Sequence, residues 1–174
     1  MKHRNPIETE LKLRIPALAP VRDLLASMGF KETTPALLER SVLWDRGGEL
    51  AASGSALRVR RYNGEVILTW KGPKVPDPLL KIRPEQETAV ESGEELEAIL
   101  SALGFAPVLR MEKTRAVWTR EELVACLDET PFGCFLELEG DPQAIKAAAE
   151  HLHLGADRVE RRSYPALFRE HGLG

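Results

Sequence analysis

The sequence predicts one domain of the α+β class, residues 1–174, in which about eight antiparallel strands form a closed or nearly closed barrel. Three observations lead to this expectation. Residues 7–15, IETELKLRI, alternate apolar and charged side chains with a period of two, as a strand with one apolar face does. Several later runs alternate in the same way, and Asn63-Gly64 between two of them is a strong hairpin signal. A length of 174 residues, 43% of them hydrophobic, suits one compact core.

The other elements follow in order along the chain. Further strands are expected in residues 37–45, 56–62, 65–73, 79–90, 108–119, 122–128 and 134–140. Helices are expected in residues 16–30, 92–105 and 141–155, with a short piece at 163–172. Asp141 is placed as an N-cap and Gly155 as the stop of the third helix, while Pro84 predicts a sheet edge or a bulge within its strand.

Composition excludes several classes of function. The formal net charge is −3 although 29% of the residues are charged, so we expect no nucleic-acid partner, whereas a locally basic site is compatible with this balance. Cys126 and Cys134 form no metal-ligand pattern with a histidine, which indicates a reducing compartment. The first residues lack the apolar segment of a signal peptide, and no apolar run approaches the ~18 residues of a membrane helix. We therefore expect a cytoplasmic protein without a membrane partner.

Nearly every predicted strand devotes one face to charged side chains, and neighbours on a face tend to have the same sign. Strand by strand, these side chains are Glu8, Glu10, Lys12 and Arg14; Arg58 and Arg60; Glu65 and Lys71; Lys81, Arg83, Glu85 and Glu87; Lys113 and Arg115; Asp128; Glu137 and Glu139. Residues two apart on one face are separated by ~6.6–6.8 Å, so same-sign pairs repel unless an opposite charge lies between them. Exposure to water would explain any single strand. The acids, however, gather on the first and last strands and the bases in the middle, which indicates a site.

Few kinds of ligand suit a site with this combination of acids and bases. Carboxylates are the hard oxygen ligands that Mg²⁺ and Mn²⁺ prefer, and Mg²⁺ is commonly shared between one or two carboxylates and the phosphates of a substrate. Lysine and arginine side chains on facing strands supply charge and forked donors for phosphate oxygens. The bases are too many for a single phosphate group. The combination therefore predicts a site for a complex of a divalent metal with a polyphosphate.

These residues also form a series of motifs in a fixed order. The motifs are ExExK (Glu8, Glu10, Lys12), RxR (Arg58, Arg60), a single lysine (Lys71), RxExE (Arg83, Glu85, Glu87), KxR (Lys113, Arg115) and D…GxFxExE (Asp128, Gly133, Phe135, Glu137, Glu139). Over residues 8–139 the series resembles the CYTH domain, the triphosphate tunnel fold of class IV adenylyl cyclases, thiamine triphosphatases and inorganic triphosphatases. The resemblance implies an eight-stranded antiparallel tunnel with its charged faces inward and helices packed outside.

The resemblance further implies a division of labour among the charged residues. The divalent metal, Mg²⁺ or Mn²⁺, would be held by Glu8, Glu10, Asp128, Glu137 and Glu139. The triphosphate would be bound by Lys12, Arg58, Arg60, Lys71, Arg83, Lys113 and Arg115. Glu85 and Glu87 would bind a second metal or orient neighbouring bases. Lys12 is the position expected to activate the attacking water, with Glu8 and Glu10 beside it, and that role requires a lowered pKa, which basic neighbours can supply.

Three functions stay open on the sequence. The first is hydrolysis of a triphosphate, either inorganic tripolyphosphate or an organic one such as thiamine triphosphate. The second is a class IV adenylyl cyclase that converts ATP to cyclic AMP and pyrophosphate. The third is a polyphosphate-binding module without catalysis, which needs the bases more than the acids. No stretch reads as an adenine pocket, so we predict the triphosphatase. The sequence is compatible with either a monomer or a homodimer.

Several conspicuous residues are not assigned to the site. Trp44 and Trp70 are expected to pack on the outside of the barrel, with stacking on an organic ring as the alternative for Trp44. His151 and His153 lie two apart on a predicted helix, hence on different faces, and so do not form a zinc site. Tyr164 is expected to fill core space, with a place at a tunnel mouth as the alternative.

Overall fold

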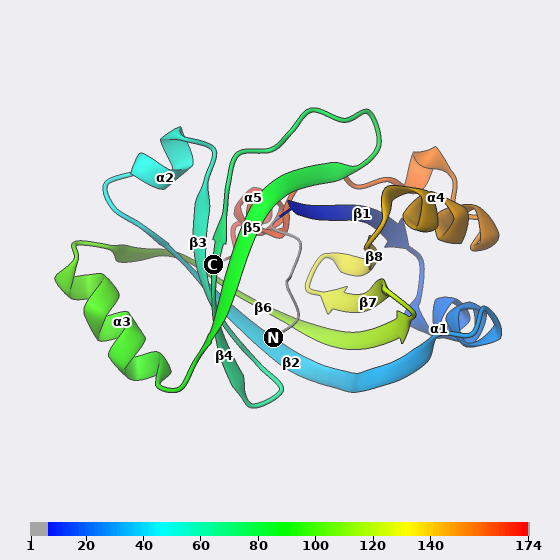
Figure 1. Ribbon diagram of the computed structural model, residues 1–174, viewed down its shortest axis with the longest axis horizontal. Coiled ribbons are helices and arrows are strands. Elements are labelled where there is room, and N and C mark those ends of the chain that lie inside the picture. The colour runs from blue at the N-terminus through cyan, green and yellow to red at the C-terminus, as the bar shows by residue number, and fades with distance from the viewer. Residues whose placement is uncertain (1–6, 174) are drawn as a thin grey trace.

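The computed structural model describes residues 7–173 and shows one closed barrel of eight antiparallel strands, as the sequence predicts (Figure 1). The strands are β1 (Ile7–Ile15), β2 (Lys31–Asp45), β3 (Ala56–Tyr62), β4 (Glu65–Lys71), β5 (Lys81–Val90), β6 (Ala106–Arg120), β7 (Leu123–Thr130) and β8 (Gly133–Glu139). The helices are α1 (Leu18–Ser27), α2 (Glu49–Ala52), α3 (Gly93–Ala102), α4 (Pro142–His151) and α5 (Tyr164–Glu170), with a 3₁₀ turn at Ala156–Arg158. Around the barrel the strands follow the order β1, β5, β4, β3, β2, β6, β7, β8.

The hairpin expected at Asn63-Gly64 joins β3 to β4. Both turn residues have positive φ angles, 51° and 78°, which is the backbone of a type I′ turn and matches the twist of the flanking strands. The turn sets the register that pairs Tyr62 with Glu65 and Arg58 with Thr69. It therefore decides that Arg58 and Arg60 point to the same side of the sheet as Thr69.

Pro84 lies neither at a sheet edge nor at a bulge, because a closed barrel has no edge. β5 pairs with β1 through Lys81–Pro84 and with β4 from Glu85 onward, so Pro84 stands where both ladders end. Its missing N–H therefore interrupts no continuous ladder. At Pro84, β5 changes its pairing partner from β1 to β4.

The largest differences from the sequence prediction concern β2, α2 and α4. β2 begins at Lys31 rather than at Leu37, and its pairing with β6 shifts register between Thr34 and Leu37, which breaks the period-two pattern there. A short helix, α2, lies between β2 and β3, where no element was expected. α4 has the predicted Asp141 cap, whose carboxylate accepts hydrogen bonds from two backbone amides, but it ends at His151 rather than near Gly155.

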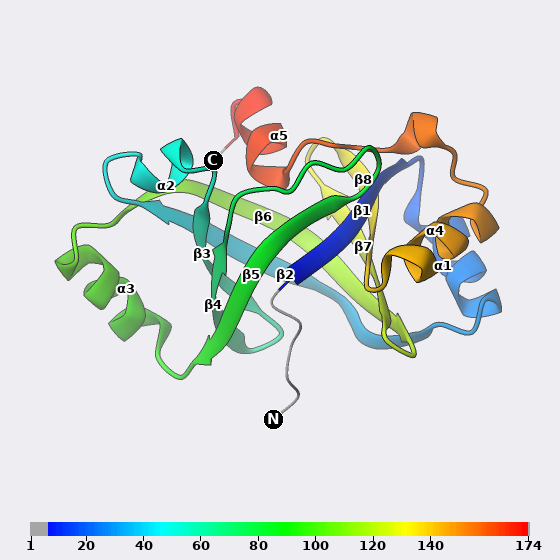
Figure 2. The same ribbon diagram turned by 45° about the horizontal axis from the view of Figure 1, so that its top comes forward.

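The hydrophobic core lies outside the barrel, between its outer face and the helices. Leu13, Leu136 and Leu138 point outward and are fully buried with residues of α1 and α4. On the opposite side α3 covers Val59 and Trp44, which confirms the packing role expected for this tryptophan. Figures 1 and 2 show the two groups of helices on opposite sides of the barrel. The interior is thereby left to the charged faces.

The segment 156–170, named here the C-terminal arm, is attached to β1 and lies over one end of the barrel (Figure 2). The backbone amide of Glu160 donates to the carbonyl of Lys12 at 2.8 Å, and Leu13 pairs with Val159. Phe168 of α5 packs with Leu43 and neighbouring inward residues of β6. The arm thus brings Tyr164 into the charged interior.

The position of the core makes a prediction about stability. Replacing Leu138, which is fully buried, with alanine leaves a cavity between barrel and helices and is expected to lower the free energy of unfolding by about 2–5 kcal/mol. The measurement is equilibrium urea unfolding. Leu103→Ala is the control because Leu103 is 59% exposed, and its effect is expected to stay within about 0.5 kcal/mol. Equal effects of the two substitutions would contradict this placement of the core.

Candidate functional site

The barrel interior, named here the charged lumen, holds both carboxylates and cations. The carboxylates are Glu8, Glu10, Glu39, Glu85, Glu87, Asp128, Glu137 and Glu139, and the cations are Lys12, Arg58, Arg60, Lys71, Lys81, Arg83, Lys113 and Arg115. All of them except Asp128 line a single cavity of about 1380 Å³. The structure therefore brings together every residue that the sequence assigned to the site.

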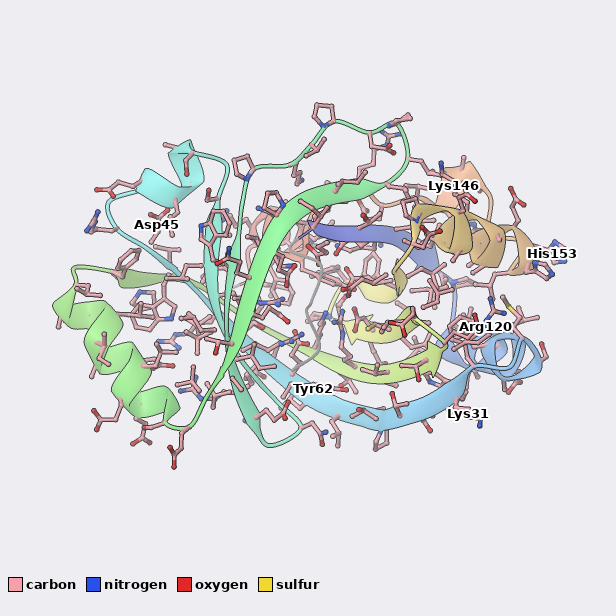
Figure 3. All side chains as sticks on the ribbon, in the orientation of Figure 1. Lys31, Asp45, Tyr62, Arg120, Lys146 and His153 are labelled. Carbon is pink, nitrogen blue, oxygen red and sulfur yellow. The ribbon has the colours of Figure 1, made fainter. Side chains whose placement is uncertain are left out.

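Half of these residues are buried and most of the others are half-buried, so their charges require pairing. An unpaired charge away from water is costly, and removing one partner of a buried pair leaves the other uncompensated. Figure 3 shows how densely side chains fill the barrel, while Lys31, Arg120 and Lys146 lie at its periphery. The alternation of each strand, closed into a barrel, concentrates the remaining charges inside.

A wall of carboxylates is formed by β1 and its neighbour β8. Glu10 stands opposite Glu139, and Lys12 stands opposite Glu137. Burial raises the pKa of Glu139, and the nearby carboxylates of Glu8 and Glu10 raise it further. Negative charges that repel one another in this way would be relieved by a cation among them.

Two lysines neutralise the outer part of this wall. Lys71 Nζ lies 2.7 Å from Glu8 and 2.6 Å from Glu85, and Lys81 Nζ lies 2.5 Å from Glu10. Lys81 was expected on a charged face of its strand, with no role assigned to it. Both ammonium groups stand where a metal ion would have to approach the carboxylates.

Asp128 is the counterion of two cations. It is fully buried, and its oxygens accept hydrogen bonds from Arg115 at 2.6 and 2.7 Å, from Lys113 at 3.0 Å and from the Tyr164 hydroxyl. Arg115 also donates to Glu137. The expected metal role of Asp128 stays a prediction, because it would require these bonds to be exchanged.

Lys12 sits at the base of the carboxylate wall, against the C-terminal arm. Its Nζ donates to the carbonyl of Arg162 at 3.1 Å, lies 3.4 Å from Glu137 and stands 3.8 Å from the centre of the Tyr164 ring. The pKa of Lys12 is lowered, chiefly by burial. The basic neighbours expected as the cause, among them Lys113, contribute less. Tyr164 is therefore a lumen residue rather than core filling.

Glu39 on β2 is a lumen carboxylate that the sequence analysis missed. It lies among Arg58, Arg60, Lys113 and Arg115, and these cations lower its pKa to about 2 although burial opposes the shift. Its strand carries one acid beside Arg40 and apolar residues, so no same-sign pair marked it. The alternation of Glu39, Ser41 and Leu43 on one face was the available signal.

Arg83 and Glu87 are used differently from the rest of their strand. Arg83 Nε donates to the backbone carbonyl of Gly72 at 2.8 Å, and a terminal nitrogen reaches the carbonyl of Gly54. Glu87 accepts from Thr69 at 2.9 Å and lies 3.5 Å from Arg58. In this structure Arg83 braces a connecting loop and Glu87 holds neighbouring bases. Their direct roles toward phosphate or a second metal stay predictions.

The donor set fits a divalent metal of the Mg²⁺ or Mn²⁺ kind. Glu8, Glu10 and Glu139 supply hard carboxylate oxygens on adjoining strands, and their mutual repulsion raises the pKa of Glu139. Within residues 7–173, however, no three carboxylates, histidines or cysteines already converge on one point. A metal would bind here by replacing the ammonium groups of Lys71 and Lys81.

The comparisons with known proteins agree with this geometry. The sequence model of the CYTH domain matches residues 6–164, and the chain belongs to the CYTH domain family. It is 30% identical over 172 residues to a Methanocaldococcus jannaschii protein named "Putative adenylate cyclase MJ0240", with 92% of this chain and 98% of that protein covered. Within the described residues no helix is long and apolar enough to cross a membrane.

Solved structures show the same fold. A Vibrio parahaemolyticus protein described as a "putative adenylate cyclase" is similar with a TM-score of 0.85 and 20% identity, covering 95% of this chain and 99% of that one. Another, from Hippeastrum, has a TM-score of 0.68 and 22% identity, covering 96% and 97%. That protein is named "Putative adenylyl cyclase HpAC1" and is described as having a dominant triphosphatase activity.

The bonds of Asp128 make a prediction about stability. In Asp128→Asn the buried Arg115 and Lys113 lose their counterion, which is expected to lower the free energy of unfolding by about 3–5 kcal/mol. Urea unfolding without metal measures this effect. The control is Glu112→Gln in the exposed pair with Arg40, expected to change it by less than about 1 kcal/mol. A stability unchanged in Asp128→Asn would make Asp128 dispensable to the empty lumen and would favour a role limited to metal binding.

Proposed function

We propose that this protein is a divalent-metal-dependent triphosphatase, which binds a triphosphate inside the charged lumen and releases the terminal phosphate. The observation that carries the proposal is a single cavity lined by both kinds of charge. Carboxylates on β1 and β8 and cations on β3 and β6 line the same cavity, so that one ligand could contact both. A metal complex of a polyphosphate has the matching distribution of charge.

Hydrolysis requires water to attack the terminal phosphorus while the bond to the bridging oxygen breaks. Arg58, Arg60 and Lys113 would orient the phosphate chain and offset the charge that develops on its oxygens. Lys12 is assigned the proton of the attacking water, since its lowered pKa makes the neutral amine accessible. A metal held by Glu8, Glu10, Glu137 and Glu139, with Asp128 as a further candidate, would supply additional neutralisation of the phosphoryl oxygens.

Class IV adenylyl cyclase is the second candidate, and the name of the Methanocaldococcus jannaschii relative is the observation in its favour. Cyclisation would use the same metal and cations but would place the α-phosphorus at the reaction centre. The described Hippeastrum protein carries a cyclase name and a dominant triphosphatase activity, which supports the order in which we place the two.

The activity is tested by incubating the purified protein with Mg²⁺ or Mn²⁺ and, separately, tripolyphosphate, thiamine triphosphate and ATP. Phosphate, pyrophosphate and cyclic AMP are resolved by chromatography. Phosphate release from at least one triphosphate is the expected result and names the preferred substrate. Pyrophosphate with cyclic AMP from ATP would identify a cyclase. Tight binding without any product would leave a binding module and contradict the proposed hydrolysis.

The carboxylate wall gives a prediction for turnover. Glu10→Gln is expected to lower metal-dependent turnover by about 100-fold, because a neutral amide is a poor ligand for a hard cation. The thermal unfolding midpoint without metal is expected to fall, because Lys81 loses its carboxylate partner, so turnover is compared at a temperature at which circular dichroism shows both proteins folded. Glu112→Gln on the outer face is the control and should keep full activity. Full activity in Glu10→Gln would remove Glu10 from the site.

The cation side gives a different signature. Arg58→Ala removes forked donors from the lumen and is expected to raise KM for the preferred triphosphate by about 10- to 100-fold, the effect of one or two charge-assisted hydrogen bonds. The exposed Arg40→Ala is the matched control, because it deletes the same side chain outside the barrel. An unchanged KM in Arg58→Ala would place Arg58 outside the phosphate-binding part of the lumen.

A further inference from the structure

The cations of the charged lumen differ in whether their hydrogen-bond donors have an acceptor. Lys71, Lys81 and Arg115 each have carboxylate oxygens within 2.7 Å, which is hydrogen-bond distance. Arg58 and Arg60 are different. Their contacts to Glu87 are 3.5 Å long, and the Nε of each is buried without a hydrogen-bond partner. The two arginines therefore have donors that the described residues leave unused.

Glu39 lies at the same place and shares this property. Its side chain is 4% exposed, and its Oε2 is buried without a hydrogen-bond partner. The nearest cations stand at 3.7 Å (Lys113), 3.8 Å (Arg115) and 3.9 Å (Arg60), too far for hydrogen bonds. The carboxylate accepts only a long bond from Ser41, at 3.3 Å. Glu39 balances the surrounding charge without occupying the donors.

Arg58 and Arg60 therefore form a candidate binding site for an anion. The unsatisfied carboxylate of Glu39 places a negative charge directly beside this site. We propose that Glu39 limits the affinity of the charged lumen for phosphate groups: it neutralises the arginine pair in the empty protein and repels a phosphate that binds there. This inference rests on the proposed function, since it concerns the same ligand. In this role Glu39 weakens the binding of product anions and so favours their release.

The charge of Glu39 persists at neutral pH, because the surrounding cations lower its pKa to about 2. A phosphate group between Arg58 and Arg60 would accept hydrogen bonds from their guanidinium groups, which line the cavity. It would then face Glu39 across a few ångströms in a medium that screens charge less than water does. The attraction between the cations and the phosphate exceeds the repulsion by Glu39. The net attraction is nevertheless weaker than it would be with a neutral residue at position 39.

Calorimetric titration with tripolyphosphate and with pyrophosphate tests this role. A chelator is present so that no turnover occurs. Glu39→Gln is expected to lower the dissociation constant of both anions by about tenfold, the effect of removing one repulsive charge at this range. The control is Glu112→Gln, which removes an exposed carboxylate and should leave both constants unchanged. Unchanged or weaker binding in Glu39→Gln would overturn the proposal and make Glu39 an organiser of the cations.

A second variant guards against a Glu39→Gln protein that does not fold. Glu39→Asp keeps the charge but withdraws it toward β2, and it is expected to tighten binding of both anions by a smaller factor. Weaker binding in Glu39→Asp would also overturn the proposal. The test separates this inference from the proposed function. Absence of anion binding in the parent protein, or tight parental binding that does not respond to position 39, overturns the role of Glu39. The proposed triphosphatase is overturned separately, by absence of phosphate release in the presence of Mg²⁺ or Mn²⁺.

Discussion

The compensation of buried charge is the constraint on which this structure depends. A barrel interior filled by apolar side chains would need no partners, but here every strand contributes ionisable groups to the inside. Their burial is tolerated because carboxylates and cations meet on neighbouring strands. The apolar core has moved outward, under α1 and α4 on one side and α3 on the other. Apolar burial and ligand binding are thereby separated in space, since the apolar core lies between the barrel and its helices and the lumen is free to be polar.

The same compensation determines how a ligand can bind. In the structure Lys71 and Lys81 neutralise the carboxylates that a metal would use, and Glu8 and Glu10 neutralise lysines that a phosphate would use. A metal ion or a polyphosphate alone would break such pairs and leave one partner uncompensated. A complex of the two replaces both partners at once. The lumen therefore favours the joint arrival of metal and polyphosphate, which is a property of the whole set of ion pairs.

The barrel and most of its interior could be predicted because the information is local. A period of two places Glu8, Glu10 and Lys12 on one face, and the Asn63-Gly64 turn fixes a register. Both features can be predicted from the local sequence without knowledge of the fold. What could not be predicted depends on contacts between distant segments. Glu39 is isolated in its strand and becomes a lumen residue only beside Arg60 and Lys113. Tyr164 lies beyond the last strand, and only the docking of the C-terminal arm on β1 brings its ring against Lys12.

The most direct test of this account is a crystal structure of the protein with tripolyphosphate and Mn²⁺, in which anomalous scattering locates the metal. The account predicts metal density against Glu8, Glu10 or Glu139, with Lys71 and Lys81 turned away from those carboxylates and phosphate oxygens against Arg58 and Arg60. Ion pairs preserved as in the empty protein, with the ligand bound outside the barrel, would contradict it.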